Sequence, residues 1–128
     1  MPVTEFNLKD LQAAATALNA SGELQRLGTC NARFGVCAGR RRYTVLFDAF
    51  ECTAVRLARK RDLASLDFAI EMPPEGWAKY LRALGTKREK GLADIDVRDP
   101  IVTGTDPLRR LNFSRYHRTF DALFRSLR

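Results

Sequence analysis

Acid–base chemistry in this chain would depend on His117, because it is the only histidine and its side chain ordinarily titrates near neutral pH. No nucleophile or carboxylate stands at a sequence spacing that would pair with it. Asp67 lies on the polar side of a half-buried strand pattern, and it is the carboxylate that we select, beside His117, as a candidate for general acid–base chemistry. A surface or structural histidine explains the same pattern, so both interpretations stay open.

The cysteines offer little chemistry. Cys30, Cys37 and Cys52 are odd in number and form no C-x-x-C pair. This pattern predicts small core thiols and neither a disulfide framework nor a metal site. The chain begins without a basic stretch followed by an apolar one, so we expect no secretory signal and a reducing, cytoplasmic location.

Basic residues concentrate in two clusters, "RRR" at positions 40–42 and "RKR" at positions 59–61, within a formal net charge of +7. Both clusters fall where we expect strand ends or turns, and solvated charge is the simplest interpretation. The alternatives are contact with nucleic acid, anionic lipid or a phosphorylated ligand. No Gly-rich phosphate loop or single-strand stacking motif accompanies the clusters, so nucleic acid is not the expected partner.

Large apolar side chains are the other unusual feature, with eight phenylalanines, three tyrosines and one tryptophan. They gather on the later predicted strands and on the two C-terminal helices. Packing of an ordinary core explains them, and so does a wall around an apolar cavity. The two interpretations need the same apolar faces, so the sequence does not separate them.

The elements that position these residues follow from periodicity and capping. Residues 1–22 contain an N-terminal helix, residues 33–71 alternate as strands, and residues 73–84 predict a middle helix. Residues 86–100 are polar and weakly periodic, which predicts a loop with one helical turn. Residues 101–128 predict a short last strand and a terminal helix.

The terminal helix should begin at Pro107, whose missing amide costs nothing in the first turn, and Asp106 can cap it. Three- and four-residue spacing predicts that its inner face carries Leu108, Leu111, Tyr116, Phe120, Leu123, Phe124 and Leu127.

The strands are close together in sequence and are joined by short polar turns, which predicts an antiparallel meander. Helices on one face of a mainly antiparallel sheet make an α+β fold. The length of 128 residues suits one domain with one core, so we expect residues 1–128 to form a single domain.

Residues 43–128 resemble the sterol carrier protein type two family of small lipid-transfer domains. "SLDFAIEMPPEGWAKYL" is similar to a late strand and the helix after it, "IVTGTDPLRRL" to the last strand and its turn, and "RYHRTFDALFRSL" to the terminal helix. The resemblance implies a mainly antiparallel sheet of about five strands with helices on one face. It also implies an apolar tunnel between the layers, and neither metal nor cofactor.

On this resemblance, apolar and aromatic side chains from the sheet and from two helices line the tunnel. They are Phe47, Phe68, Ile70, Trp77, Tyr80, Leu81, Phe113, Tyr116, Phe120 and Phe124. The charged segment "GTKREKGLADIDVRDP" and the arginines near the mouth depart from the family's pattern. They make a plain sterol a weaker expectation and leave room for an anionic amphiphile, such as an acyl-CoA or a steroid carboxylate, with Arg40, Arg41 and Arg42 as contacts of its head group.

Three functions follow. The first, which we expect, is non-catalytic binding or transfer of an apolar or amphipathic small molecule, a sterol or steroid, a fatty acyl chain or an acyl-CoA, with transient contact at a membrane surface. The second is a cofactor-free cyclase, hydratase or isomerase that acts on an apolar substrate in the same pocket. The third is binding of nucleic acid or an anionic surface through the arginine clusters.

Overall fold

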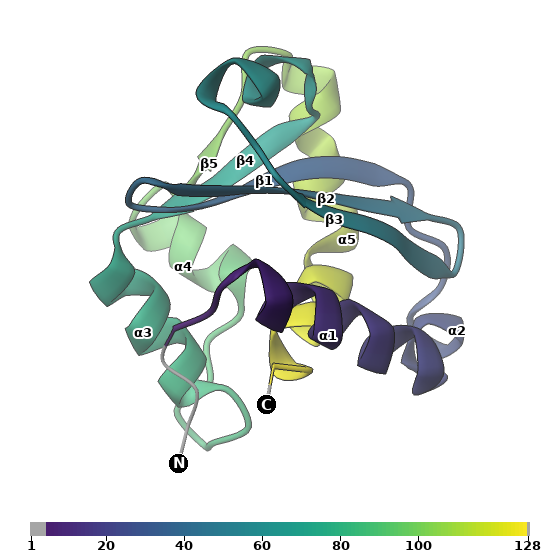
Figure 1. The fold of residues 1–128 in the computed structure, drawn as a ribbon. Coiled ribbons are helices and arrows are strands. Elements are labelled where there is room, and N and C mark those ends of the chain that lie inside the picture. Colours follow the sequence, from purple (N-terminus) through teal and green to yellow (C-terminus); the bar gives the residue numbers. More distant parts are fainter. Residues whose placement is uncertain (1–4, 128) are drawn as a thin grey trace.

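A computed structural model describes residues 5–127, which form one sheet and the helices packed against it (Figure 1). Helix α1 begins with a capping box. The Asp10 amide donates to the Asn7 side chain (2.8 Å), and the Asn7 amide donates to the Asp10 carboxylate (3.1 Å). In chain order the elements are α1 (Leu8–Ala20), α2 (Glu23–Leu27), β1 (Ala32–Ala38), β2 (Arg41–Asp48), β3 (Glu51–Leu57), the 3-10 helix η1 (Lys60–Ser65), β4 (Phe68–Met72), α3 (Pro74–Ala83), α4 (Leu92–Arg98), β5 (Val102–Thr103) and α5 (Pro107–Arg125).

The five strands form one sheet in the order β3-β2-β1-β4-β5. Strand β1 runs parallel to β4, with Phe34 opposite Phe68, and the other three pairings are antiparallel. The predicted α+β class is confirmed, but the prediction of a mainly antiparallel sheet is wrong, because the sheet is mixed. After β3 the chain does not turn back beside that strand. It crosses the sheet through η1 and places β4 beside β1 in the same direction.

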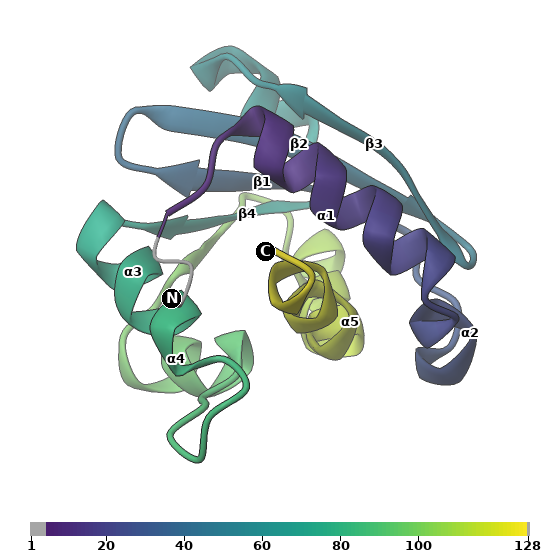
Figure 2. The same cartoon turned by 60° about the horizontal axis from the view of Figure 1, so that its bottom comes forward.

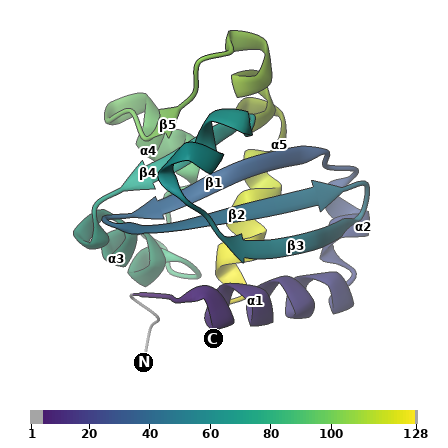
Figure 3. The same cartoon turned by 45° about the horizontal axis from the view of Figure 1, so that its top comes forward.

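Helices α1, α3 and α5 lie on one side of the sheet, which we call the inner face, and η1 lies on the other (Figures 1 and 3). Gly35 in β1 makes room for η1, because a Cβ atom at this position would lie 2.6 Å from Cδ2 of Leu63. The 3-10 helix therefore covers the outer face where β1 and β4 meet.

The core between the sheet and the helices is largely aromatic. Phe34 lies at its centre, with ring centroids 4.3 Å from Phe120, 5.4 Å from Phe68 and 6.3 Å from Phe47. A single cluster of buried side chains connects these rings with residues of α1, α3 and α5. Sheet and helices are thus held together by close ring packing.

Helix α5 begins as predicted. The Asp106 carboxylate accepts the amides of Leu108 (2.9 Å) and Arg109 (3.4 Å), and Pro107 is the first helical residue.

The buried face of α5 differs from the prediction in its first turns. Leu108 and Leu111 are 77% and 47% exposed, so their assignment to the inner face is wrong. In the same turns Arg109 and Asn112 bind the Asp67 carboxylate instead, which leaves the two leucines facing solvent.

The segment predicted as a loop with one helical turn contains α4, a helix of seven residues. The Leu92 side chain of this helix is fully buried. The Asp96 carboxylate accepts the amides of Ile101 (2.8 Å) and Val102 (3.1 Å). Leu92 is the one fully buried residue of this helix, so the sequence shows little periodicity here.

Helix α1 lies along β3 and binds its backbone (Figure 3). The Asn19 side chain accepts the Cys52 amide (2.8 Å) and donates to the Cys52 carbonyl (3.0 Å), as a neighbouring strand would. Gln12 donates to the Val55 carbonyl (3.0 Å). The edge of the sheet at β3 is therefore covered by a helix.

Candidate functional site

Two basic segments that are separate in the sequence meet at one end of the sheet. Arg40 lies in the turn between β1 and β2, and Arg41 and Arg42 begin β2. Strands β2 and β3 are antiparallel, so the start of β2 lies beside the end of β3, where the Ala58 amide donates to the Arg42 carbonyl (2.9 Å). Arg59 follows at once, and the sheet pairing thus brings the two clusters together.

These segments border an open pocket of about 760 Å³, which we call the arginine pocket. Its lining residues are five arginines, one aspartate and three less polar residues: Arg40, Arg41, Arg42, Arg59, Arg61, Asp62, Tyr43, Leu57 and Ala58. The Asp62 carboxylate accepts the backbone amide of Arg59 (2.8 Å). The arginines predicted as head-group contacts therefore share a pocket with the second basic cluster.

The charge of the arginine pocket is not neutralised by ion pairs. Among residues 5–127, the ion pairs join Arg26 to Glu23, Arg109 to Asp67 and Arg125 to Glu89, and none includes a residue of the pocket. Arg41 donates from Nη1 to the carbonyl of Phe6 (3.2 Å). Guanidinium groups without carboxylate partners attract phosphate and carboxylate and bind them in bidentate geometry.

A smaller pocket of about 260 Å³ lies at the same end of the sheet. Its lining includes Cys37, Gly39 and Glu71. Burial, together with the nearby Glu71 carboxylate, raises the pKa of the Cys37 thiol to about 11. A thiol with this pKa is protonated at neutral pH, so it lacks the nucleophilic form.

All three cysteines are free and buried, as predicted for core thiols. Burial raises the pKa values of Cys30 and Cys52 to about 12.

The residues predicted to line a tunnel come together between the sheet and the helices. Trp77 and Phe124 have ring centroids 5.0 Å apart, and Phe68 and Phe113 are 5.8 Å apart. Neither pocket described above includes any of these ten residues. They pack against each other in the core, except that Tyr116 is only half-buried, and their role as ligand contacts stays a prediction.

The predicted acid–base candidates have separate surroundings. Asp67 accepts hydrogen bonds from the Arg33 amide (3.1 Å), Arg109 Nε (3.1 Å) and Asn112 Nδ2 (3.0 Å). His117 is half-buried further along α5, with its ring centroid 6.4 Å from that of Phe113. Within residues 5–127 no hydrogen bond or ion pair joins Asp67 to His117. Asp67 holds α5 against β1 and β4, and this structural role accounts for its contacts.

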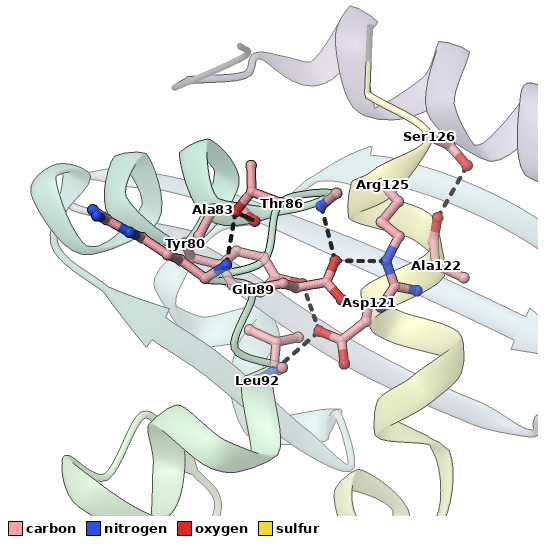
Figure 4. A network of polar contacts seen from close by, with 12 residues as sticks. Tyr80, Ala83, Thr86, Glu89, Leu92, Asp121, Ala122, Arg125 and Ser126 are labelled. Atoms are coloured by element: carbon pink, nitrogen blue, oxygen red, sulfur yellow. Dashed lines mark hydrogen bonds and ion pairs between the residues drawn. The ribbon is translucent and has the colours of Figure 1, made fainter.

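Sequence reasoning missed a buried polar network around Asp121 (Figure 4). The Tyr80 hydroxyl donates to Asp121 Oδ1 (2.6 Å), and the Leu92 amide donates to the same oxygen (3.1 Å). Beside them Arg125 pairs with Glu89 (3.0 Å). The network thus connects α3, the start of α4 and α5.

Burial raises the pKa of Asp121 above its ordinary value of 3.8, although the bonds from Tyr80 and Leu92 act against this rise. Burial and the neighbouring Asp121 charge raise the pKa of Tyr80 well above 10. The one signal in the sequence is a carboxylate within the apolar stretch "TFDALF". A perturbed acid of this kind can serve catalysis or structure, and here it joins three helices.

Neither metal binding nor a relative identifies the site. In the described part of the chain, no three His, Cys, Asp or Glu side chains group in a way that could hold a metal ion. Within residues 5–127, no helix has the length and hydropathy needed to cross a membrane. A scan against protein-family models, a search of curated proteins and a search of solved structures returned no significant match.

Proposed function

We propose that this protein is a non-catalytic binding or transfer protein for an anionic amphiphile, and that the arginine pocket holds the head group. The observation that carries the proposal is the meeting of five arginines, from two segments, around one pocket of about 760 Å³. With one carboxylate among them, these side chains give the pocket an excess of positive charge. Phosphate and carboxylate are the head groups that guanidinium binds best.

The less polar part of the lining favours an amphiphile over a small inorganic anion. Leu57 is 69% exposed beside the arginines, so an apolar side chain is accessible to a ligand in the same pocket. Tyr43 lines the same pocket and its ring centroid lies 5.9 Å from that of Phe6 in the aromatic core. A ligand with both a charged and an apolar part can use all of these groups.

The resemblance to the sterol carrier protein type two family supports the same class of ligand. It favours a fatty acyl chain or acyl-CoA, and the arginines make an uncharged sterol a poorer fit. Transient contact with a membrane surface, from which such a ligand would be taken, belongs to this proposal, as does a cytoplasmic location.

Calorimetric titration with dodecyl phosphate, below its micelle concentration, tests the proposal. Dodecanol serves as the uncharged probe of equal chain length. We expect the phosphate to bind and the alcohol to bind at least about tenfold more weakly, because a charge-assisted hydrogen bond contributes about 1.5–3 kcal/mol. The double variant Arg42→Gln with Arg61→Gln should weaken phosphate binding by about tenfold or more.

The matched control carries the same loss of charge outside the pocket, in Arg88→Gln with Arg98→Gln. Both residues are exposed, and their replacement should change the affinity less than about twofold. Equal weakening by the two double variants would show that net charge, not the pocket, binds the probe. Tight binding of a single-stranded oligonucleotide that persists at about 200 mM salt would favour a nucleic-acid function instead.

A further inference from the structure

Phe6 fills the place where the sheet, α3 and α5 meet, although it belongs to none of them. It lies in the extended segment before α1, which Figures 1 and 2 both draw beside α3. Its side chain is 4% exposed, and its ring centroid lies 5.9 Å from Tyr43, 5.3 Å from Trp77 and 5.9 Å from Phe124. Those three rings belong to β2, α3 and α5, so Phe6 acts as a wedge between regular elements.

One arginine connects this wedge to the arginine pocket. Arg41 lines the pocket, and its Nη1 donates to the backbone carbonyl of Phe6 (3.2 Å). A phosphate oxygen competes with that carbonyl for the planar guanidinium group, and the charge-assisted bond to phosphate is about twice as strong as a neutral one. An anion in the pocket therefore competes with the Phe6 carbonyl for the Nη1 donor of Arg41.

We propose that Phe6 occupies the place of the ligand's apolar group, and that an anion bound at Arg41 releases it. The apolar group of the same ligand then takes the position among Tyr43, Trp77 and Phe124. The inference rests on the proposed function for its head-group site, and it specifies the ligand further: a phosphomonoester or carboxylate whose apolar group next to the head has about the width of a benzyl side chain. One buried ring replaces another, so the apolar contributions nearly cancel and the head group provides the affinity.

The test uses benzyl phosphate as the probe with a ring and inorganic phosphate as the probe without one. Affinities come from calorimetric titration of the full chain. In Phe6→Ala the ligand no longer has to displace a side chain, so we expect the affinity for benzyl phosphate to rise by about tenfold. The affinity for inorganic phosphate should change less than about twofold. Phe6→Leu, which keeps more apolar volume, should show a smaller rise in the same direction and remains informative if Phe6→Ala does not fold.

Trp77 provides an independent readout. It is the only tryptophan, its Nε1 donates to the Cys37 carbonyl (2.8 Å), and its ring packs against that of Phe6 in a T-shaped arrangement. Departure of Phe6 should change the emission of Trp77 and its quenching by acrylamide when benzyl phosphate binds. Arg41→Gln should increase the quenching before any ligand is added, whereas Arg88→Gln should not.

The outcomes separate the two proposals. Binding of benzyl phosphate with unchanged affinity in both Phe6 variants and a silent Trp77 would overturn the exchange of Phe6 and leave the arginine pocket in place. If neither anion binds the natural chain, the pocket itself fails and the exchange fails with it. Phe50→Ala, at an exposed phenylalanine in the turn between β2 and β3, is the matched control. It should alter neither affinity, and a rise like that of Phe6→Ala would contradict the inference.

Discussion

Asp121 is the one buried acidic side chain among residues 5–127, and its protonation links the stability of the protein to pH. Its pKa in the folded chain is raised above 3.8 by burial, so above that pH the folded state holds more protons than the unfolded state. The stability linked to this proton is fully present below 3.8 and is lost as the pH rises through the raised pKa. Tyr80 acts in the same direction at pH values above 10.

Asp121→Asn keeps the shape of the side chain, and its carbonyl oxygen still accepts from Tyr80 and the Leu92 amide. We expect the variant to gain stability relative to the natural chain when the pH is raised from about 4 to about 7. The natural chain loses the buried proton of Asp121 over this range, and the variant has no such proton. Urea denaturation at both pH values measures this. Asp48→Asn removes an exposed carboxylate far from this network and is the control. If the difference in free energy of unfolding between the variant and the natural chain is the same at both pH values, the pKa of Asp121 is not raised by folding.

Ala49 is the one non-glycine residue with positive φ (54°) among residues 5–127. The left-handed backbone conformation costs an L-residue about 1 kcal/mol. Glycine avoids this cost, but its greater freedom in the unfolded chain offsets part of the gain. We predict that Ala49→Gly raises the free energy of unfolding by about 0.5 kcal/mol. Ala13→Gly, at an exposed site within α1, should lower it by about 1 kcal/mol. Denaturant titration of both variants compares them, and a loss at both sites would contradict the prediction.

At the scale of elements, the cover of β3 by α1 depends on Asn19. We expect Asn19→Ala to lower the free energy of unfolding by about 2 kcal/mol, because the Cys52 amide and carbonyl both lose their partner. Gln12→Ala removes a single bond and should cost about half as much. Thermal unfolding measures the stabilities. Light scattering detects association of two molecules through the uncovered edge of β3. Equal losses in the two variants would show that the side-chain bonds do not determine the cover.

Local patterns predicted the elements better than their pairing. Alternation identified strands within residues 33–71, and capping residues identified the start of α5, since both signals are local. The neighbour of β4 depends on the path of the chain between β3 and β4, and alternation alone carries no information on that path. Gly35 was the available signal, because a glycine inside an apolar strand indicates close approach by another segment.

At the scale of the whole molecule, the sheet and the core need both halves of the chain. Strand β4 pairs with β1, and α5 contributes Phe113, Phe120 and Phe124 to the core. We predict that a chain ending at residue 105 shows no cooperative unfolding transition by near-ultraviolet circular dichroism. Leu108→Ser in the full chain is the control for local effects in α5, and it should change stability by less than about 0.5 kcal/mol. A cooperative transition in the shortened chain would show that α5 is dispensable.

The arginine pocket belongs to this scale as well. Both clusters were visible in the sequence, and their charge indicated acidic partners. Their convergence was not visible, because it follows from the pairing of β2 with β3 and from the crossing of η1. The Asp121 network was missed for a similar reason: its three helices are neighbours only in the folded chain.

The three buried cysteines allow the rate of local opening to be measured at three places in the natural sequence. Cys52 lies in the edge strand β3, Cys37 in the central strand β1, and Cys30 just before β1. A thiol reagent reacts with each of them only when its surroundings open. We predict that Cys52 is labelled first under native conditions, and that Asn19→Ala accelerates its labelling more than that of Cys37. Mass spectrometry of digests would give the three rates, and equal rates would mean that the sheet opens all at once.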